Sequence, residues 1–318
     1  MNLQIEFTAD VPQSIKGTTQ SDRLSPPGHL ADCSSKRFFQ RTDFRSSIWI
    51  GAVLVASGLF HLTLLWVTSA EWNGPLSPRK PALFGVSAGV SVWSIAWVLT
   101  KIYPWRHDRF LENLMANCLL LEVGLITLQY WRGVPSHFNH GNMIDATIET
   151  AMLGFILVVT VGIGCLAWRA RRLPPMADAL AIAIRAGLWL LLASCGLGLF
   201  VTIAGEINVS HGRSSEIWGR AGVLKYPHGA ALHAIQVLPI FYALLNWLRV
   251  PSAAWLLRSA VAAHILFMSH ALWQTLHGRE RLDVDLVGGI TLAAAGLLIL
   301  LPTVAIAWKF VSINPKTA

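Results

Sequence analysis

Histidine side chains suggest the most specific chemistry in this sequence of 318 residues. Imidazole is the commonest metal ligand in proteins, and its charge changes near neutral pH. His61, His233 and His270 lie in three different apolar segments, at similar predicted depths. Ligands on facing helices of a bundle commonly hold a cofactor. We therefore expect His61, His233 and His270 to form a cofactor site, for which haem b is one candidate ligand.

A carboxylate at a similar predicted depth suggests a second chemistry. Glu149 lies near the start of the fourth apolar segment. Imidazole and carboxylate ligands together suit a divalent metal ion. The predicted metal ligands are His61, Glu149, His233 and His270. The pattern does not distinguish haem b from a divalent metal.

Further polar side chains fall in the same predicted layer. Polar groups inside a bilayer are costly, so they usually face the bundle interior or a water-filled cavity. His270, Gln274 and His277 follow helical spacing and form one stripe. The residues predicted to line a shared cavity are Gln129, Glu206, His228, Gln236, Gln274 and His277. The loop histidines His137, His140 and His211 are expected to be solvent-exposed, and a single intramembrane histidine is often only a partner in helix packing.

The elements that must position these groups are membrane-spanning helices. The sequence is 54% hydrophobic and 13% charged, whereas a soluble domain usually carries about 25% charged residues. A spanning helix needs about 20 mainly apolar residues. Eight such segments run over residues 48–70, 81–102, 110–131, 144–168, 180–205, 228–248, 253–276 and 286–308. The composition therefore predicts an all-α, polytopic membrane helix bundle.

The charge distribution predicts the organisation and orientation of the chain. Residues 1–46 are expected to be a flexible polar tail, 47–309 the eight-helix transmembrane domain, and 310–318 a short second tail. Lys and Arg are enriched on the face that carries both tails, which is typical of the cytoplasmic side. We expect both termini in the cytoplasm, a location in the cell membrane, and the His-rich layer in the non-cytoplasmic half.

The function remains open between three classes at this point. They are a haem- or metal-binding redox protein, a proton- or cation-linked transporter, and a metal-dependent membrane enzyme; a structural role is the remaining alternative. No nucleotide-binding, serine-hydrolase or covalent-haem motif is present. The net charge of +8 does not predict nucleic-acid binding, because the basic residues flank apolar segments. The expected partners are the lipid bilayer and either a membrane redox protein or a small solute.

Overall fold

The computed structural model describes residues 44–72, 74, 76–173 and 178–313. Within these residues, eight spans are long and apolar enough to cross a membrane, which confirms the predicted helical bundle. Most of the predicted N-terminal tail and the end of the C-terminal one lie outside the described residues.

The helices follow one another along the chain with short connections. They are α2 (Arg45–Val67), α3 (Arg79–Leu99), α4 (Asp108–Trp131), α5 (Met143–Ala170), α6 (Ala179–Ser210), α7 (Lys225–Leu232), α8 (Ala234–Trp247), α9 (Ala253–Leu276) and α10 (Leu286–Ile313). Two short strands, β1 (Ile217–Trp218) and β2 (Gly222–Val223), form an antiparallel hairpin between α6 and α7.

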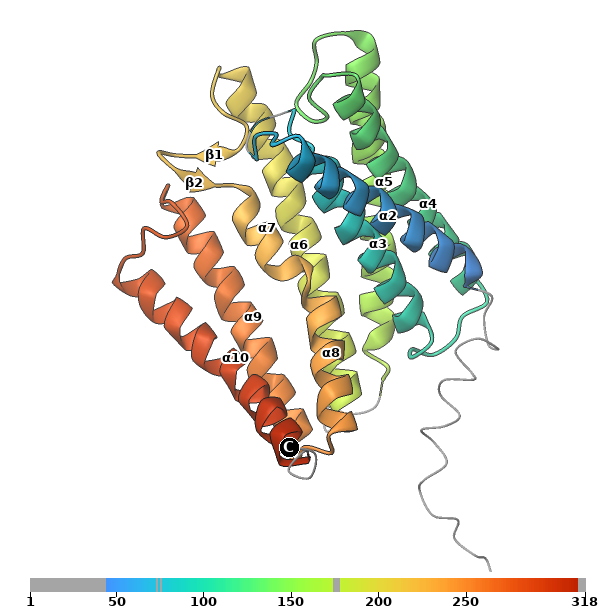
Figure 1. Ribbon diagram of the computed structural model, residues 1–318, viewed down its shortest axis with the longest axis vertical. Helices are drawn as coiled ribbons and strands as arrows, with labels where there is room; N and C mark the ends of the chain where they lie inside the picture. The colour runs from blue at the N-terminus through green and yellow to red at the C-terminus, as the bar shows by residue number, and fades with distance from the viewer. Residues whose placement is uncertain (1–43, 73, 75, 174–177, 314–318) are drawn as a thin grey trace, which may run out of the picture. The chain divides into compact units, whose positions relative to one another are not determined.

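Successive spans run in opposite directions, so the chain crosses the bundle repeatedly (Figure 1). The β1–β2 hairpin therefore lies at the same end as the α2–α3, α4–α5 and α9–α10 connections. We call this the hairpin end. Because the helices alternate, the polar layer predicted from the sequence belongs to helix segments near this end.

The sixth span differs from the predicted continuous segment 228–248. It consists of α7 and α8, which are separated at His233. Residues 207–227, which fall between the fifth and sixth predicted segments, contain the last turn of α6, the hairpin and the start of α7. The predicted boundary of the fifth segment at residue 205 is also too early, since α6 continues to Ser210.

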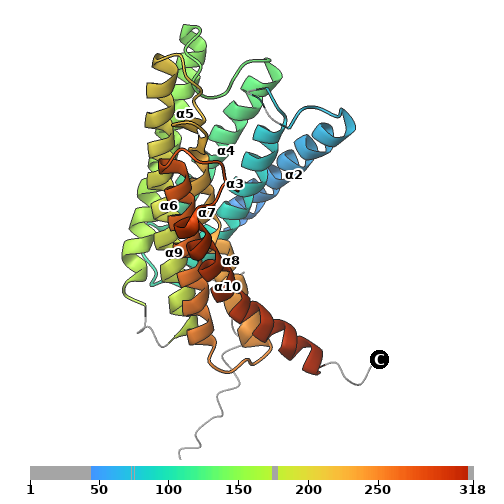
Figure 2. The ribbon, with the colours of Figure 1, turned by 90° about the vertical axis from the view of Figure 1, so that its left-hand side faces the viewer.

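Within the described residues, the core consists of two apolar clusters. The first includes Leu119 and Val123 of α4, Val159 of α5 and Leu191 of α6. The second lies mainly among α6, α8 and α9. α10 packs chiefly on α9 (Figure 2). Only 11% of its most apolar stretch of 18 residues is buried. Most of the α10 surface is therefore uncovered by the rest of the described chain.

Candidate metal site

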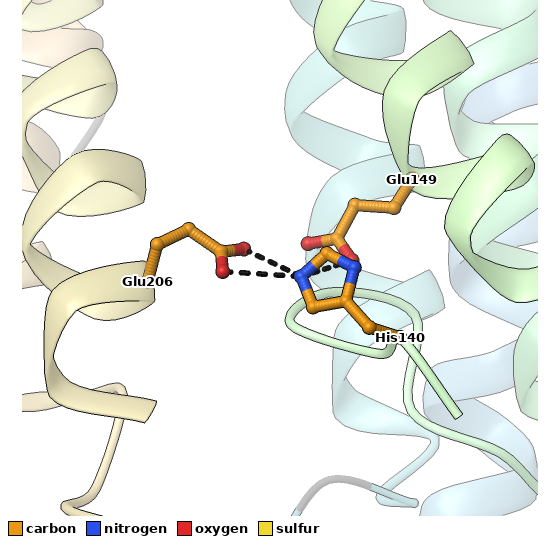
Figure 3. Close-up of side chains that lie close together, drawn as sticks. All are labelled: His140, Glu149 and Glu206. Atoms are coloured by element: carbon orange, nitrogen blue, oxygen red, sulfur yellow. Dashed lines mark hydrogen bonds and ion pairs between the residues drawn. The ribbon is translucent and has the colours of Figure 1, made fainter. Parts of the chain in front are cut away.

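Three side chains from different elements meet near the hairpin end of α5 and α6 (Figure 3). They are His140 of the α4–α5 connection, Glu149 of α5 and Glu206 of α6. The Nε2 atom of His140 lies 3.1 Å from Oε2 of Glu206 and 3.7 Å from Oε2 of Glu149. One ligand atom from each residue lies within 4.8 Å of the others. The cluster thus brings one imidazole and two carboxylates together.

The α4–α5 connection is held in place at both of its ends. At its start, Arg132 forms an ion pair with Asp145 at 2.6 Å, and Gln129 donates a hydrogen bond to the same carboxylate at 3.1 Å. At its end, the Asn142 side chain accepts a hydrogen bond from the backbone N–H of Asp145 and so caps α5. These contacts fix the connection that carries His140.

Glu149 is oriented by the same connection. The backbone N–H groups of Phe138 and Asn139 donate to its two carboxylate oxygens, at 2.5 and 2.9 Å respectively. Phe138 adopts a φ of +57°, which is uncommon for a residue other than glycine. This turn aims two successive N–H groups at Glu149. Each carboxylate oxygen keeps a second lone pair for another partner.

The pKa values of the two histidines in this connection are shifted in opposite directions. The hydrogen bond to Glu206, with Glu149 nearby, raises the pKa of His140 above its ordinary value. Burial lowers the pKa of neighbouring His137 to about 4; the Lys80 charge also lowers it, whereas Glu149 raises it. Consequently His137 is neutral at physiological pH, whereas the pKa of His140 lies above the ordinary histidine value.

The spacing of the donors is compatible with a metal ion. Ligands bound about 2.1 Å from a tetrahedral zinc ion lie about 3.4 Å from one another. The distances of 3.1 and 3.7 Å from His140 to the two glutamates fall on either side of that value. The His140 side chain is 54% exposed, so solvent reaches the site from its side. Three protein ligands together with bound water would complete the coordination of a divalent ion.

The structure places His61 in a different environment. Its side chain is buried, and Trp131 of α4 donates a hydrogen bond to Nε2 at 3.2 Å. Its Nδ1 atom donates to the backbone oxygen of Ser57 at 2.8 Å. Both ring nitrogens of His61 therefore have protein partners.

Two polar side chains of the sixth span form hydrogen bonds with neighbouring helices. His228 donates from Nδ1 to the backbone oxygen of Ser194 at 2.8 Å, and Gln236 donates to Ser91 at 3.3 Å. His233 lies at the break between α7 and α8 and is exposed. This break turns His233 away from the interior position expected for a continuous helix.

The stripe on α9 divides into buried and exposed parts. His270 and Gln274 are fully buried, while His277 is exposed. Gln274 donates to the backbone oxygen of Asp283 at 2.8 Å. His270 stacks on Phe267 with ring centroids 6.5 Å apart, and neither of its nitrogens has a partner among the described residues.

Of the predicted site residues, Glu149 and Glu206 are therefore brought into direct proximity. Gln129 supports the connection beside them through Asp145. The interactions described for His61, His233 and His270 involve different neighbours, so their proposed shared cofactor stays a prediction. His140 was expected to be simply exposed, and its pairing with two glutamates was missed. The sequence offered one indication of this pairing, because His140 lies only a short distance before Glu149 along the chain.

No protein-family model matches the chain, and no curated protein or solved structure matches it either.

Proposed function

We propose that this multi-pass membrane protein binds a divalent metal ion through His140, Glu149 and Glu206. The observation that carries the proposal is the approach of three ligand atoms, from a loop and two helices, to within 4.8 Å. Imidazole and carboxylate ligands suit zinc, iron or manganese. The contacts of Phe138 and Asn139 with Glu149 supply the supporting shell that metal sites require.

The number of ligands favours a metal that takes part in chemistry. Structural zinc sites usually have four protein ligands, whereas catalytic sites have three and keep one position for water or substrate. Here three side chains are available, and His140 is half exposed. A metal in such a site lowers the pKa of bound water and supplies a nucleophile. We therefore favour a metal-dependent membrane enzyme, located in the cell membrane with the hairpin end on its non-cytoplasmic side.

A cation-linked transporter remains the second candidate. It is favoured by the position of the cluster on a connection and two helix ends, where an ion arriving from solvent would first meet the protein. Metal-dependent hydrolysis of a substrate would support the enzyme, whereas uptake of metal ions into liposomes containing the protein would support the transporter. The haem-binding alternative predicts a Soret band that depends on His61, His233 or His270.

The metal proposal is tested by titrating the purified, metal-free protein with zinc, manganese and ferrous iron. Calorimetry should detect one site per chain for at least one of these ions. Glu206→Gln should weaken binding at least tenfold, because the amide replaces an anionic ligand with a neutral one.

Glu216→Gln is the matched control for this substitution. Glu216 forms an exposed ion pair with Lys225 at 2.9 Å and does not belong to the metal cluster. Its replacement should leave metal affinity unchanged. Equal affinity of wild-type protein and Glu206→Gln would show that His140 and Glu206 form only an ion pair.

A further inference from the structure

A second acidic group lies deep within the bundle, away from the metal cluster. Glu122 belongs to α4, about 21 Å from the first residue of that helix and about 14 Å from the last, at 1.5 Å rise per residue. Since the apolar layer of a bilayer is about 30 Å thick, this position is intramembrane. The residue is 7% exposed.

The surroundings of Glu122 are almost entirely apolar. Its α4 neighbours Cys118, Leu119 and Val123 belong to the apolar cluster that also contains Val159 of α5 and Cys195 of α6. Oε2 of Glu122 is buried and has no hydrogen-bond partner among the described residues. Glu122 also forms no ion pair with any of the described residues.

The thiols of Cys118 and Cys195 lie close enough to Glu122 to interact with it electrostatically. The helices with most contacts to α4 are α2, α3 and α5, and α6 contributes Cys195 to the same apolar cluster. The remaining titratable residues of these four helices lie toward the helix ends and are Arg45 and His61 on α2, Arg79 and Lys80 on α3, Asp145, Glu149, Cys165 and Arg169 on α5, and Arg185 and Glu206 on α6. None of these charges forms an ion pair with Glu122 in the described structure.

An ionised carboxylate in this position would be buried without a counter-ion, which is strongly unfavourable. A protonated carboxyl avoids that cost and retains the ability to release the proton. We propose that Glu122 is an intramembrane proton-binding site, occupied at neutral pH. Such a group, in a helix that also contributes Gln129 to the hairpin end, is the type of residue that proton-linked membrane proteins use.

An apolar carbodiimide tests the protonation state directly. The carboxyl proton moves to a carbodiimide nitrogen while a carboxylate oxygen bonds to the central carbon. The O-acylisourea then rearranges to a stable N-acylurea, so the whole reagent is added and nothing is released. The reaction requires a protonated acid in a place that the apolar reagent reaches from lipid.

The experiment treats the full-length protein in detergent or lipid nanodiscs with dicyclohexylcarbodiimide at about pH 7, followed by peptide mass mapping. We expect the peptide containing Glu122 to gain one reagent molecule, and Glu122→Gln to lose that adduct. Glu112→Gln, which alters another buried glutamate of the same helix, should keep the Glu122 adduct. A Glu122 that is modified at about pH 5 but not at about pH 7 would overturn the proposal, because the reagent then reaches a carboxyl that has lost its proton.

The pH dependence gives a second test that needs no variant. An ordinary glutamate ionises near pH 4.3, so its labelling would fall about tenfold for each pH unit above about 5. Labelling of Glu122 should instead stay constant between about pH 5 and pH 7. A tenfold loss per pH unit over that range would refute the proton site, whatever the outcome of the metal titrations.

Discussion

At the scale of single residues, His140 controls how the proposed metal site responds to pH. Its raised pKa means that it is protonated and paired with Glu206 below that value. A metal ion must displace this proton. Metal affinity should therefore rise up to tenfold per pH unit below the folded-state pKa of His140, and level off above it. Calorimetric titrations at several values from about pH 5.5 to 8.5 measure this slope.

The same pairing affects the metal-free protein. Because the folded-state pKa is raised, the stabilisation from this pair is fully present below the ordinary histidine pKa of about 6.5 and is lost as pH rises through the folded value. Glu206→Gln should lower the pKa of His140, as measured by NMR titration of its ring. An unchanged ring pKa would contradict the role assigned to Glu206. His137, with its pKa near 4, serves as an internal reference.

At the scale of elements, α2 and α3 pack through glycines. A Cβ atom at Gly85 would lie 2.8 Å from the Cα of Gly58 and 2.8 Å from the backbone oxygen of Leu54. Neither backbone atom can move without separating the helices. Gly85→Ala should therefore destabilise the protein by about 1–3 kcal/mol and lower its melting temperature in detergent.

Gly124→Ala on α4 is the control for that substitution. A Cβ at Gly124 would meet nothing within 4 Å, so the added methyl group has room. Its melting temperature should match or slightly exceed that of the wild type, because alanine favours a helix more than glycine. Equal melting temperatures of the two variants would contradict the role assigned to the close contact between α2 and α3 at Gly85.

At the scale of the whole molecule, the even number of spans determines the topology. Eight apolar spans, if each crosses the membrane once, would put the two ends of the chain on one side and the α6–α7 connection on the other. A reporter inserted at Gly212 and one fused after the last residue should therefore report opposite sides. The excess of Lys and Arg near the tails predicts that the terminal reporter is cytoplasmic. The same side for both reporters would exclude eight crossings.

The sequence determined the number and approximate limits of the spans, because apolar length is a local property that each segment carries by itself. It also indicated Glu149 and Glu206 as polar groups near one end of the bundle. It could not indicate that the sixth span breaks at His233, since residues 228–248 are apolar on both sides of that position. The break depends on how α7 and α8 pack against α6 and α9.

Only the tertiary structure decided which polar groups meet. His140 reaches Glu149 and Glu206 because Arg132 and Asn142 fix the α4–α5 connection on Asp145, and because the backbone turns at Phe138. Those contacts depend on the conformation of a loop. A loop has no regular spacing of apolar residues from which its conformation could be predicted. Likewise, only the side chains that α5 and α6 place around Glu122 leave its Oε2 atom without a partner among the described residues.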